Sequence, residues 1–303
     1  MTLQQLRQVL TIAESNSMNE AAKKLFVSQP NLSATVREVE EELGITVFMR
    51  NNRGITVTAE GEEFLGYAKQ VVEQYHLLEN RYLNVESKKK FSVSMQHYSF
   101  AVKAFVQLAK EVGMDEYEFA VHETKTKEVI DNVKNLKSEI GVLYLSDFNE
   151  KVLRKLFKEC DIEFKELFTC NTYVYLWKKH PLAGQKEITL DDLQEYPCLT
   201  FEQGVNNSFY YAEEMMSTYE YKRVIKADDR ATMLNLMVGL NGFTLCSGII
   251  SEDLNGDDYA AIPLKESEKM HIGYIKHKGT KLSKLGEISV SYTHLRAHET
   301  DQY

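Results

Sequence analysis

The chain has 303 residues, of which 43% are hydrophobic and 27% charged, a composition typical of a globular protein large enough for two or three domains. No apolar run approaches the length of a membrane span, no cleavable leader follows Met1, and the four cysteines are scattered without a C-x-x-C pair; we therefore expect a cytoplasmic protein with no zinc site and no disulfide framework. The net charge is −9, so charge alone does not predict nucleic-acid binding.

The N-terminal segment has the pattern of two short helices. An apolar face that runs from Leu3 to Ala13 predicts a first helix, and Asn16 and Ser17 follow as its end. A second helix is predicted from about Asn19 to Leu25. Its small residues at 21 and 22 would allow another helix to pack closely against it.

A third helix is predicted after a short corner at residues 26–28. The hydroxyl of Ser28 can cap this helix, and Pro30 fits its first turn, where a missing N–H leaves no intrahelical bond unmade. The helix therefore begins at or very near Gln29. Apolar residues from Leu32 to Leu43 recur at the spacing of one inward-facing stripe, and Gly44 supplies the C-terminal stop.

The outward face of the third helix carries small and amide side chains, which suit a close approach to base edges. Gln and Asn can pair with adenine in the major groove, whereas Arg37, farther along, is better placed for a phosphate. An ordinary helical hairpin with a solvated polar face is the alternative interpretation. The predicted DNA-contacting residues of this helix and its cap are Ser28, Gln29, Pro30, Asn31, Ser33, Ala34 and Arg37.

The order of the residues favours DNA binding. The string A-A-x-x-L-x-x-S-Q-P-x-L-S begins at Ala21 and is continued by V-R-E-V-E-E-E-L-G-I-x-V-F-x-R, which ends at Arg50. It resembles the N-terminal domain of LysR-type bacterial transcriptional regulators over more than a dozen ordered positions, although Met18 stands where the family usually has an aromatic residue. The resemblance implies a winged helix-turn-helix over residues 1–58, with double-stranded DNA as its partner.

A small hairpin is predicted after the third helix. Strand-like pieces at 47–50 and 55–58 flank a turn at 51–54. The resemblance gives Arg53, at the tip of this wing, a role in the narrow minor groove, the alternative being a solvated turn arginine. Arg50 is expected to be structural or to contact a phosphate. Thr58 is expected to cap the next helix and to present that helix end to a phosphate.

Charge does not mark the first domain as a DNA-binding one. Residues 1–58 carry six Lys and Arg side chains against six Asp and Glu, so their net charge is zero, and the acidity of the chain lies mainly in its C-terminal part. The cationic groups must therefore be clustered in space. We expect Glu38 and the glutamates at 40–42 to lie toward the far end of the third helix, away from DNA.

Residues 59–90 are predicted to form a linker helix and a polar hinge. Steps of four and three residues separate its apolar positions, which make a heptad seam sustained for three repeats. A lone helix could pack this stripe on its own domain. In the LysR family the linker helix forms the dimer contact, so the resemblance implies a homodimer that sets two recognition helices on two half-sites, with a tetramer as a further assembly. The seam consists of Phe64, Ala68, Val71, Tyr75, Leu78, Tyr82 and Val85.

From residue 91 strands alternate with helices, which is the pattern of a mostly parallel α/β sheet. The arrangement resembles the LysR effector domain, whose two Rossmann-like lobes hold an inducer between them, and the whole chain is then an α+β multidomain protein. We expect this domain at 91–290, with lobe I at about 91–163 and 265–290 and lobe II at about 164–264.

Two details of lobe II are predicted separately. A helix is expected from Ser208 to Ser217. The Gly-rich turn at 239–242 is one residue longer than the common family form, at Asn241, and it ends in Cys246-Ser247-Gly248 where a proline often stands. No G-x-G-x-x-G follows any predicted strand, so we expect no dinucleotide cofactor.

Effector-binding residues are predicted at strand ends, where ligands bind in open α/β sheets and helix N-termini offer N–H groups to anions. Each of these side chains has an alternative role as a helix cap or a turn group. A small anionic metabolite is the expected effector class. The predicted effector-binding residues are Gln96, Ser99, Thr124, Thr126, Gln203 and Ser247.

The last residues, 291–303, resemble translated sequencing-adapter read-through and are expected to be a non-native tail, so His294 and His298 are not predicted to bind metal. No catalytic or metal-binding constellation rises above chance, and the cysteines are expected to be buried thiols, with a redox switch as the alternative.

The sequence thus predicts a sequence-specific DNA-binding transcriptional regulator of the LysR type that responds to a small molecule, and not an enzyme. The alternative is a small-molecule-binding module or an enzyme of α/β fold with an unrelated helical N-terminus.

Overall fold

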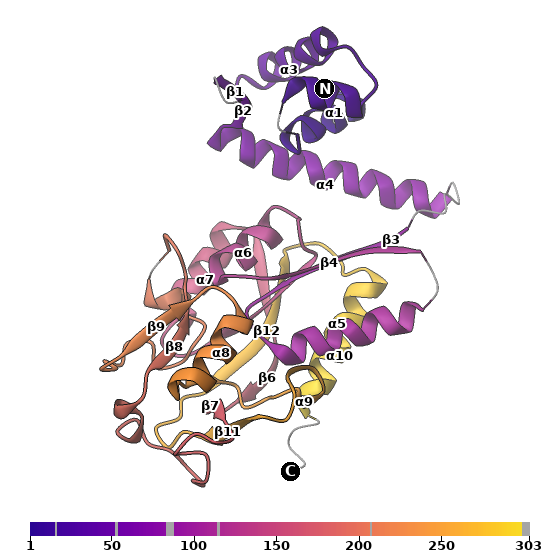
Figure 1. The fold of residues 1–303 in the computed structure, drawn as a ribbon. Coiled ribbons are helices and arrows are strands. Elements are labelled where there is room, and N and C mark those ends of the chain that lie inside the picture. The colour runs from indigo at the N-terminus through magenta and orange to yellow at the C-terminus, as the bar shows by residue number, and fades with distance from the viewer. Residues whose placement is uncertain (16, 52–53, 83–87, 114–115, 207, 299–303) are drawn as a thin grey trace. The chain divides into compact units, whose positions relative to one another are not determined.

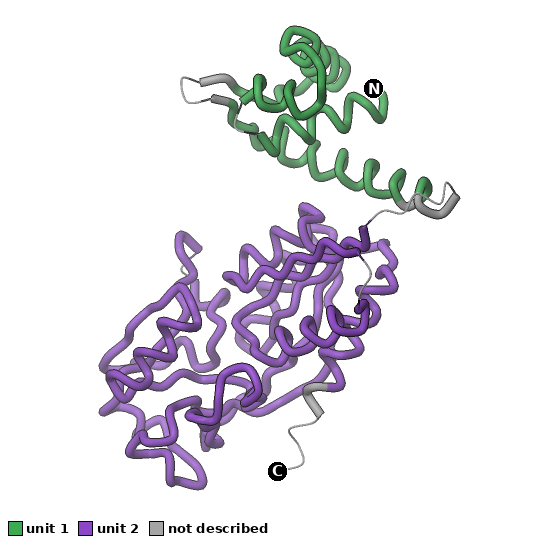
Figure 2. The backbone as a smooth tube through the Cα atoms, turned by 45° about the vertical axis from the view of Figure 1, so that its right-hand side comes forward, with its two compact units in different colours: residues 1–87 green, residues 88–303 purple. Residues whose placement is uncertain are grey.

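The computed structural model describes residues 1–303 except 16, 52–53, 83–87, 114–115, 207 and 299–303. The chain divides into two compact units, residues 1–87 and residues 88–303 (Figure 2). Each unit has its own hydrophobic core. Within the described ranges, no helix is both long enough and apolar enough to cross a membrane.

Unit 1 consists of short helices, a two-stranded wing and one long helix. Its elements are α1 (Leu3–Ala13), α2 (Met18–Lys24), α3 (Gln29–Leu43), β1 (Phe48–Asn51), β2 (Gly54–Val57) and α4 (Ala59–Tyr82). Ser28 Oγ accepts a hydrogen bond from Asn31 N at 3.4 Å, which confirms the predicted cap of α3. Gly44 follows α3 with a φ of 69°, the left-handed conformation that commonly ends helices at glycine.

The inward stripe of α3 forms the centre of the unit 1 core. Leu32, Val36 and Val39 are buried against apolar residues of α1 and α2. The small side chains of Ala21 and Ala22 are buried at the α2–α3 contact, as the sequence predicted. This packing holds α3 by one face and leaves the opposite face on the surface.

The predicted heptad seam of α4 divides into two parts. Ala68 is buried together with Val72 against Leu6 of α1, so the start of the stripe packs within unit 1. Farther along the helix, Val71, Tyr75 and Leu78 are exposed, as is Tyr67 one turn before them. Of the rest of the predicted seam, Val85 lies outside the described residues, and Val71, Tyr75 and Leu78 make an exposed stripe together with Tyr67. We call it the α4 stripe, consisting of Tyr67, Val71, Tyr75 and Leu78.

One carboxylate connects the far end of α3 to the wing. Glu40 Oε1 accepts hydrogen bonds from the backbone N–H groups of Val47, at 2.7 Å, and Phe48, at 3.0 Å. Glu38, two residues earlier, accepts a hydrogen bond from the Gln5 side chain at 3.0 Å. The side chains of Glu38 and Glu40 on α3 thus stabilise the fold of unit 1. This role explains why acidic residues occur in a domain that is expected to bind DNA.

Unit 2 has two lobes, and the larger one is built on a five-stranded sheet in the order β4-β3-β5-β12-β6 (Figure 1). β3 is parallel to β4 and β5, whereas β12 is antiparallel to both of its neighbours. The strands are β3 (Lys89–Met95), β4 (Tyr117–Glu123), β5 (Ile140–Leu145), β6 (Ile162–Cys170) and β12 (Met270–His277).

Helices cover both faces of this sheet. Successive residues of β5 alternate between the two cores: Val142 packs with α5 and α10, and Leu143 packs with α6 and α7. A strand covered on both faces is apolar at every position, which accounts for the sequence IGVLYL. The helices are α5 (Ser99–Val112), α6 (Thr126–Lys134), α7 (Glu150–Glu159) and α10 (Lys284–His298).

The smaller lobe contains an antiparallel sheet in the order β10-β7-β11 and a parallel pair, β8 and β9. Leu199 and Met237 belong to the core that joins the pair to α8. The elements are β7 (Tyr173–Trp177), η1 (Asp192–Glu195), β8 (Cys198–Phe201), η2 (Phe209–Tyr211), β9 (Val224–Ala227), α8 (Arg230–Leu240), β10 (Thr244–Cys246), α9 (Glu252–Asn255) and β11 (Tyr259–Pro263).

Two boundaries differ from the sequence expectation. β6 pairs with β12 as far as Cys170, so the larger lobe ends near residue 170 and not near 164. The helix predicted from Ser208 to Ser217 is wrong, because only the short 3-10 turn η2 forms there and Met216 has a φ of 55°. Two glutamates of this segment, Glu213 and Glu214, are buried, and both accept hydrogen bonds from residues outside it.

The C-terminal helix α10 continues past residue 290 to His298, and the side chain of Thr293 is buried. Tyr292 donates a hydrogen bond to Glu111 of α5 at 2.5 Å. Residues 291–298 therefore prolong the native helix, and the foreign origin of the tail stays a prediction from its sequence.

The link between Glu40 and the wing generates a first prediction. Hydrogen bonds to a charged group contribute about 1.5–3 kcal/mol, so Glu40→Ala should make local opening of the wing easier by an energy of that order. Hydrogen exchange at the amides of Val47 and Phe48 in the full chain should then become about tenfold faster or more. Glu41→Ala, at an exposed neighbouring position, is the control. Unchanged exchange in Glu40→Ala would show that the bonds contribute nothing.

Candidate DNA-binding surface and ligand cleft

The predicted base-reading face of α3 lies on the surface of unit 1. Ser28, Pro30, Asn31 and Arg37 are exposed, and Gln29, Ser33 and Ala34 are half-buried. These residues share one side of the helix because its other side is fixed in the core. The surface is thus built as the sequence predicted, and its contact with bases remains a prediction.

Gln29 is held in one orientation at the leading end of α3. Its Nε2 donates a hydrogen bond to Ser33 Oγ, one turn later, at 2.7 Å. The second amide hydrogen and Oε1 remain available for the adenine edge, which offers one acceptor and one donor. The two residues act as a unit in which Ser33 positions Gln29.

The predictions for the wing residues Arg50, Arg53 and Thr58 are tested by the structure to different extents. Thr58 Oγ1 accepts a hydrogen bond from Gly61 N at 2.9 Å, which confirms its role as the cap of α4, and donates one to Thr46 O. Its hydroxyl is therefore already used within unit 1, and a phosphate would meet the N–H groups of the helix end. Arg50 lies on β1, opposite Ile55, with its side chain outside the described part. Arg53 lies outside the described residues altogether.

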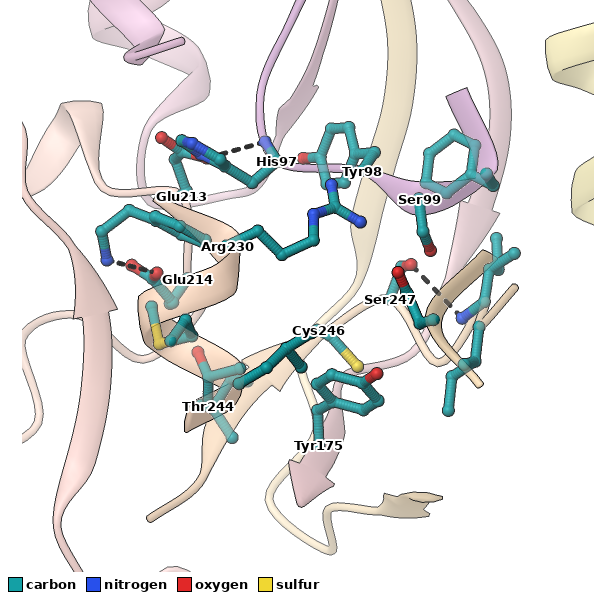
Figure 3. A pocket seen from close by; sticks show the side chains of 18 of the residues that line it. His97, Tyr98, Ser99, Tyr175, Glu213, Glu214, Arg230, Thr244, Cys246 and Ser247 are labelled. Carbon is teal, nitrogen blue, oxygen red and sulfur yellow. Dashed lines mark hydrogen bonds and ion pairs between the residues drawn. The ribbon is translucent and has the colours of Figure 1, made fainter. Parts of the chain in front are cut away.

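A cavity between the two lobes of unit 2 is the candidate ligand site (Figure 3). Its volume is about 90 Å³, on a scale in which one enclosed water takes roughly 10–15 Å³. One wall comes from the loop after β3 and the start of α5, at 97–100. The other comes from α8 and from β10 with the turn that follows it, at 244–250. The cavity thus has room for a small molecule.

The predicted effector-binding residues fall into two groups. Ser99 and Ser247 line the cavity, on opposite walls. Thr124 lies away from it and donates a hydrogen bond to Glu128. The other three, Gln96, Thr126 and Gln203, are buried and are not among the residues that line the cavity.

These three residues belong to a continuous chain of hydrogen bonds. Gln96 Nε2 donates to Thr126 Oγ1 at 2.6 Å, and Thr126 N donates to Gln203 Oε1 at 3.2 Å. Gln203 Nε2 then donates to Glu213 Oε1 at 3.0 Å. Glu213 Oε2 meets His97 at both its backbone N, 3.0 Å away, and its ring Nδ1, 2.8 Å away. The bond from Thr126 N to Gln203 and the contacts of His97 with Glu213 cross between the lobes, and ligand binding by the three predicted residues stays a prediction.

Glu214, on the cavity wall, was not predicted from the sequence. Burial, followed by the charge of Glu213 beside it, raises the pKa of Glu214 to about 8 from its ordinary value of 4.5. One of its oxygens accepts a hydrogen bond from Phe201 N at 2.8 Å. At neutral pH this carboxyl group is therefore mostly protonated and uncharged.

Arg230 was also missed, because in the sequence it is only the first residue of a helix. Figure 3 shows its side chain crossing the cavity toward Tyr98 and Ser99. Its guanidinium forms an ion pair with Glu123 at the end of β4, and this ion pair joins the lobes. Thr244 Oγ1, on the same cavity wall as Arg230, is buried and has no hydrogen-bond partner among the described residues.

The cavity contains one thiol, that of Cys246. Burial raises its pKa to about 12, so the reactive thiolate form is scarce at neutral pH. Burial raises the pKa of Cys160 and of Cys198 as well. Within the described ranges, no cluster of three or more His, Cys, Asp or Glu side chains is arranged to hold a metal ion.

Comparison with known proteins finds two family models on the chain. Residues 3–62 match the family model described as "Bacterial regulatory helix-turn-helix protein, lysR family", and residues 113–287 match "LysR substrate binding domain". The regulator CysL of Bacillus subtilis is 28% identical over 214 residues, which make up 68% of this chain and 66% of CysL.

Solved structures share the fold over nearly the whole length. A full-length OxyR variant from Pseudomonas aeruginosa has a TM-score of 0.72 at 19% identity, covering 97% of this chain and 95% of its own. LysG from Corynebacterium glutamicum, solved with bound effector Arg, has a TM-score of 0.63 at 13% identity and covers 99% of both chains.

The raised pKa of Glu214 predicts a pH-dependent stability. Between its unfolded value of 4.5 and its folded value of about 8, unfolding releases a proton, so the free energy of unfolding should decrease as the pH rises through this range. Glu214→Gln keeps the shape of the side chain but cannot ionise. In this variant the decrease of a few kcal/mol in the free energy of unfolding over this pH range should disappear.

The measurement is denaturant unfolding of the full chain, followed by the fluorescence of Trp177, the single tryptophan, which lies in lobe II. Glu220→Gln changes a surface carboxylate and serves as the control. If Glu214→Gln and the native chain had the same pH profile, the assignment of a buried neutral carboxyl group would be wrong.

Proposed function

This chain belongs to the LysR family of bacterial regulators, and we propose that its unit 1 reads operator DNA while its unit 2 responds to a small molecule held in the cleft between its lobes. The family consists of DNA-binding transcriptional regulators with an effector-binding domain, and not of enzymes. Because its work is done on DNA, we place it in the cytoplasm.

The observation that carries the DNA-binding part is the leading end of α3. Gln29 is oriented by Ser33 on the free face of a helix whose other face is fixed in the core. A side chain held in place before binding loses less entropy on binding and discriminates bases more sharply. Pro30 and Ala34 beside it are short enough to let this end of the helix approach the floor of the groove.

The α4 stripe supports assembly into a homodimer. Tyr67, Val71, Tyr75 and Leu78 lie on one side of α4 and are exposed. A row of exposed apolar side chains along a helix is typical of a protein interface, and two such helices can pack side by side. Dimerisation would double the number of phosphate contacts, which compensates for the absence of net positive charge in residues 1–58.

The proposed role of Gln29 predicts a change in specificity. Gln29→Ala should reduce the preference for the selected DNA site over a scrambled site by about tenfold, since a paired base contact is worth ~1–3 kcal/mol. Arg37→Ala should weaken binding to both sites equally, because a phosphate contact carries no sequence information.

The DNA probe for this experiment is selected by the native chain from a random library, and the affinities are measured at one fixed salt concentration. Ser33→Ala releases the Gln29 amide and also removes a predicted DNA-contacting hydroxyl, and it should cause a smaller loss of preference than Gln29→Ala. An equal loss on both sites in Gln29→Ala would assign it to the backbone and remove it from base reading.

The α4 stripe predicts the behaviour of a charged variant. Val71→Glu should convert the dimer into a monomer in sedimentation velocity, because burying an unpaired carboxylate costs several kcal/mol. Lys69→Glu, on the opposite side of the same helix, changes the net charge more and should leave the dimer intact. The same measurement distinguishes a dimer from a tetramer, and a dimeric Val71→Glu chain would exclude this stripe as the interface.

A further inference from the structure

We infer that the cleft of unit 2 takes an amphipathic monocarboxylate, whose carboxylate replaces Glu123 as the partner of Arg230 while its apolar body lies along α8. The inference deepens the proposed function and rests on it in taking this cleft as the effector site. It names the chemical class of the ligand and the bond between the lobes that the ligand breaks.

Arg230 is the cation that faces the cavity. Its guanidinium lies inside, directed toward Tyr98 and Ser99 (Figure 3), whereas Glu123 does not line the cavity. The Glu123 side chain is 29% exposed and that of Arg230 is 21% exposed, so Glu123 stays in contact with water. A partly exposed carboxylate loses little when its cation turns to another anion. Replacing Glu123 by a ligand carboxylate as the partner of Arg230 therefore costs the protein little free energy.

The cavity contains further hydrogen-bond donors for an anion. Thr244 is only 6% exposed and its Oγ1 has no recorded partner in the described chain. Ser99 begins α5, a helix of 14 residues whose N-cap residue Tyr98 provides no side-chain acceptor for the first N–H groups. A buried hydroxyl without a partner and an uncapped helix start both favour a negatively charged acceptor.

Apolar side chains form another part of the lining, which also includes the polar groups of Tyr175, Ser247 and Asn255. Met233, Leu234 and Met237 reach it from α8, and Leu245, Ile249 and Ile250 from β10 and the following turn. Methionine and aliphatic side chains fit a flexible hydrocarbon body without specific hydrogen bonds. A ligand with one charged end and an apolar body therefore matches both parts of the cavity.

The two glutamates of the cavity wall disfavour a cationic ligand and a dianionic one. Glu213 is already bonded to His97 and to Gln203, and Glu214 accepts from Phe201 N and is kept neutral by burial. Neither presents a free carboxylate to a cationic ligand. One guanidinium beside two carboxyl groups would also leave a dianion undercompensated. A monoanion is the charge that the cleft can match.

Ligand binding would change the relation between the lobes. Arg230 lies on lobe II and Glu123 on lobe I, so the exchange removes one ion pair between them. The neighbouring pair, Lys125 of lobe I and Asp228 of lobe II at 3.3 Å, lies outside the cavity lining and would remain. The ligand thus affects one of two adjacent connections, which is a differential contact of the kind that couples binding to conformation.

The test uses the full chain and calorimetric titration with hexanoate, hexylamine and hexanol, three probes with the same carbon chain. Hexanoate should bind at least about tenfold more tightly than the other two. Arg230→Gln should weaken hexanoate by about tenfold or more, and Arg230→Lys by less. Glu123→Gln should tighten it, because Arg230 no longer has a competing partner.

Asp228→Asn is the matched control, since it removes the neighbouring ion pair between the lobes without touching the cavity, and it should leave hexanoate affinity unchanged. The gain expected for Glu123→Gln cannot arise from misfolding. Hexanoate binding no tighter than hexanol, no saturable binding of hexanoate to Glu123→Gln, or weaker binding to that variant would each overturn the inference.

The proposed function is tested separately in the same samples. If the native chain binds its selected DNA site but hexanoate does not bind, the ligand class is wrong and the regulator assignment stands. If hexanoate binds as expected and no DNA site can be selected, the cleft assignment stands and the DNA-binding role of unit 1 fails.

Discussion

Two consecutive glutamates buried between the lobes are the constraint on which the structure of unit 2 depends. A carboxyl group removed from water must be neutralised or hydrogen-bonded, and both solutions occur here. Glu213 takes donors from His97 and Gln203, which follow strands of different lobes, and Glu214 takes the N–H of Phe201 and retains its own proton. The two lobes are therefore held at the point where the cleft begins, and the ring of His97 stacks on that of Phe201 with 3.7 Å between their centres.

In unit 1, by contrast, the short helices are held by contacts at their ends. Ser17 and Ser28 cap α2 and α3, Thr58 caps α4, and Glu40 connects α3 to the wing. Helices of this length are marginal on their own and depend on such contacts together with burial of one face. The consequence is a rigid surface built from few residues, on which small side chains can lie at the leading end of α3.

Much of unit 1 could be predicted from the sequence, because its signals are local. Helical spacing located Leu32, Val36 and Val39 in the core, and cap chemistry located the start of α3.

The additional residue in the lobe II turn was also predicted from the sequence. Asn241 adopts a φ of 51° there and accepts a hydrogen bond from the Trp177 indole at 2.9 Å, so the longer turn has a structural use.

The cleft was predicted less well, because residue type does not reveal a partner far along the chain. Gln96, Thr126 and Gln203 have the chemistry of a ligand site, yet each is bonded to residues that the fold brings from elsewhere. Arg230 carried no local signal, since the direction of its side chain depends on how the lobes meet. The helix expected at 208–217 failed for the same reason: the partners of Glu213 and Glu214 are distant in sequence.

The pairing of β6 with β12 has a mechanical consequence. β6 ends and β12 begins where the chain passes between the lobes, and Cys170 lies opposite Met270 at that point. Because the two connections leave from neighbouring strands, rotation of the smaller lobe about them is the displacement that would strain the structure least. A ligand then has to restrain only one soft motion, and the entropy lost on closing is small compared with that of two independently tethered bodies.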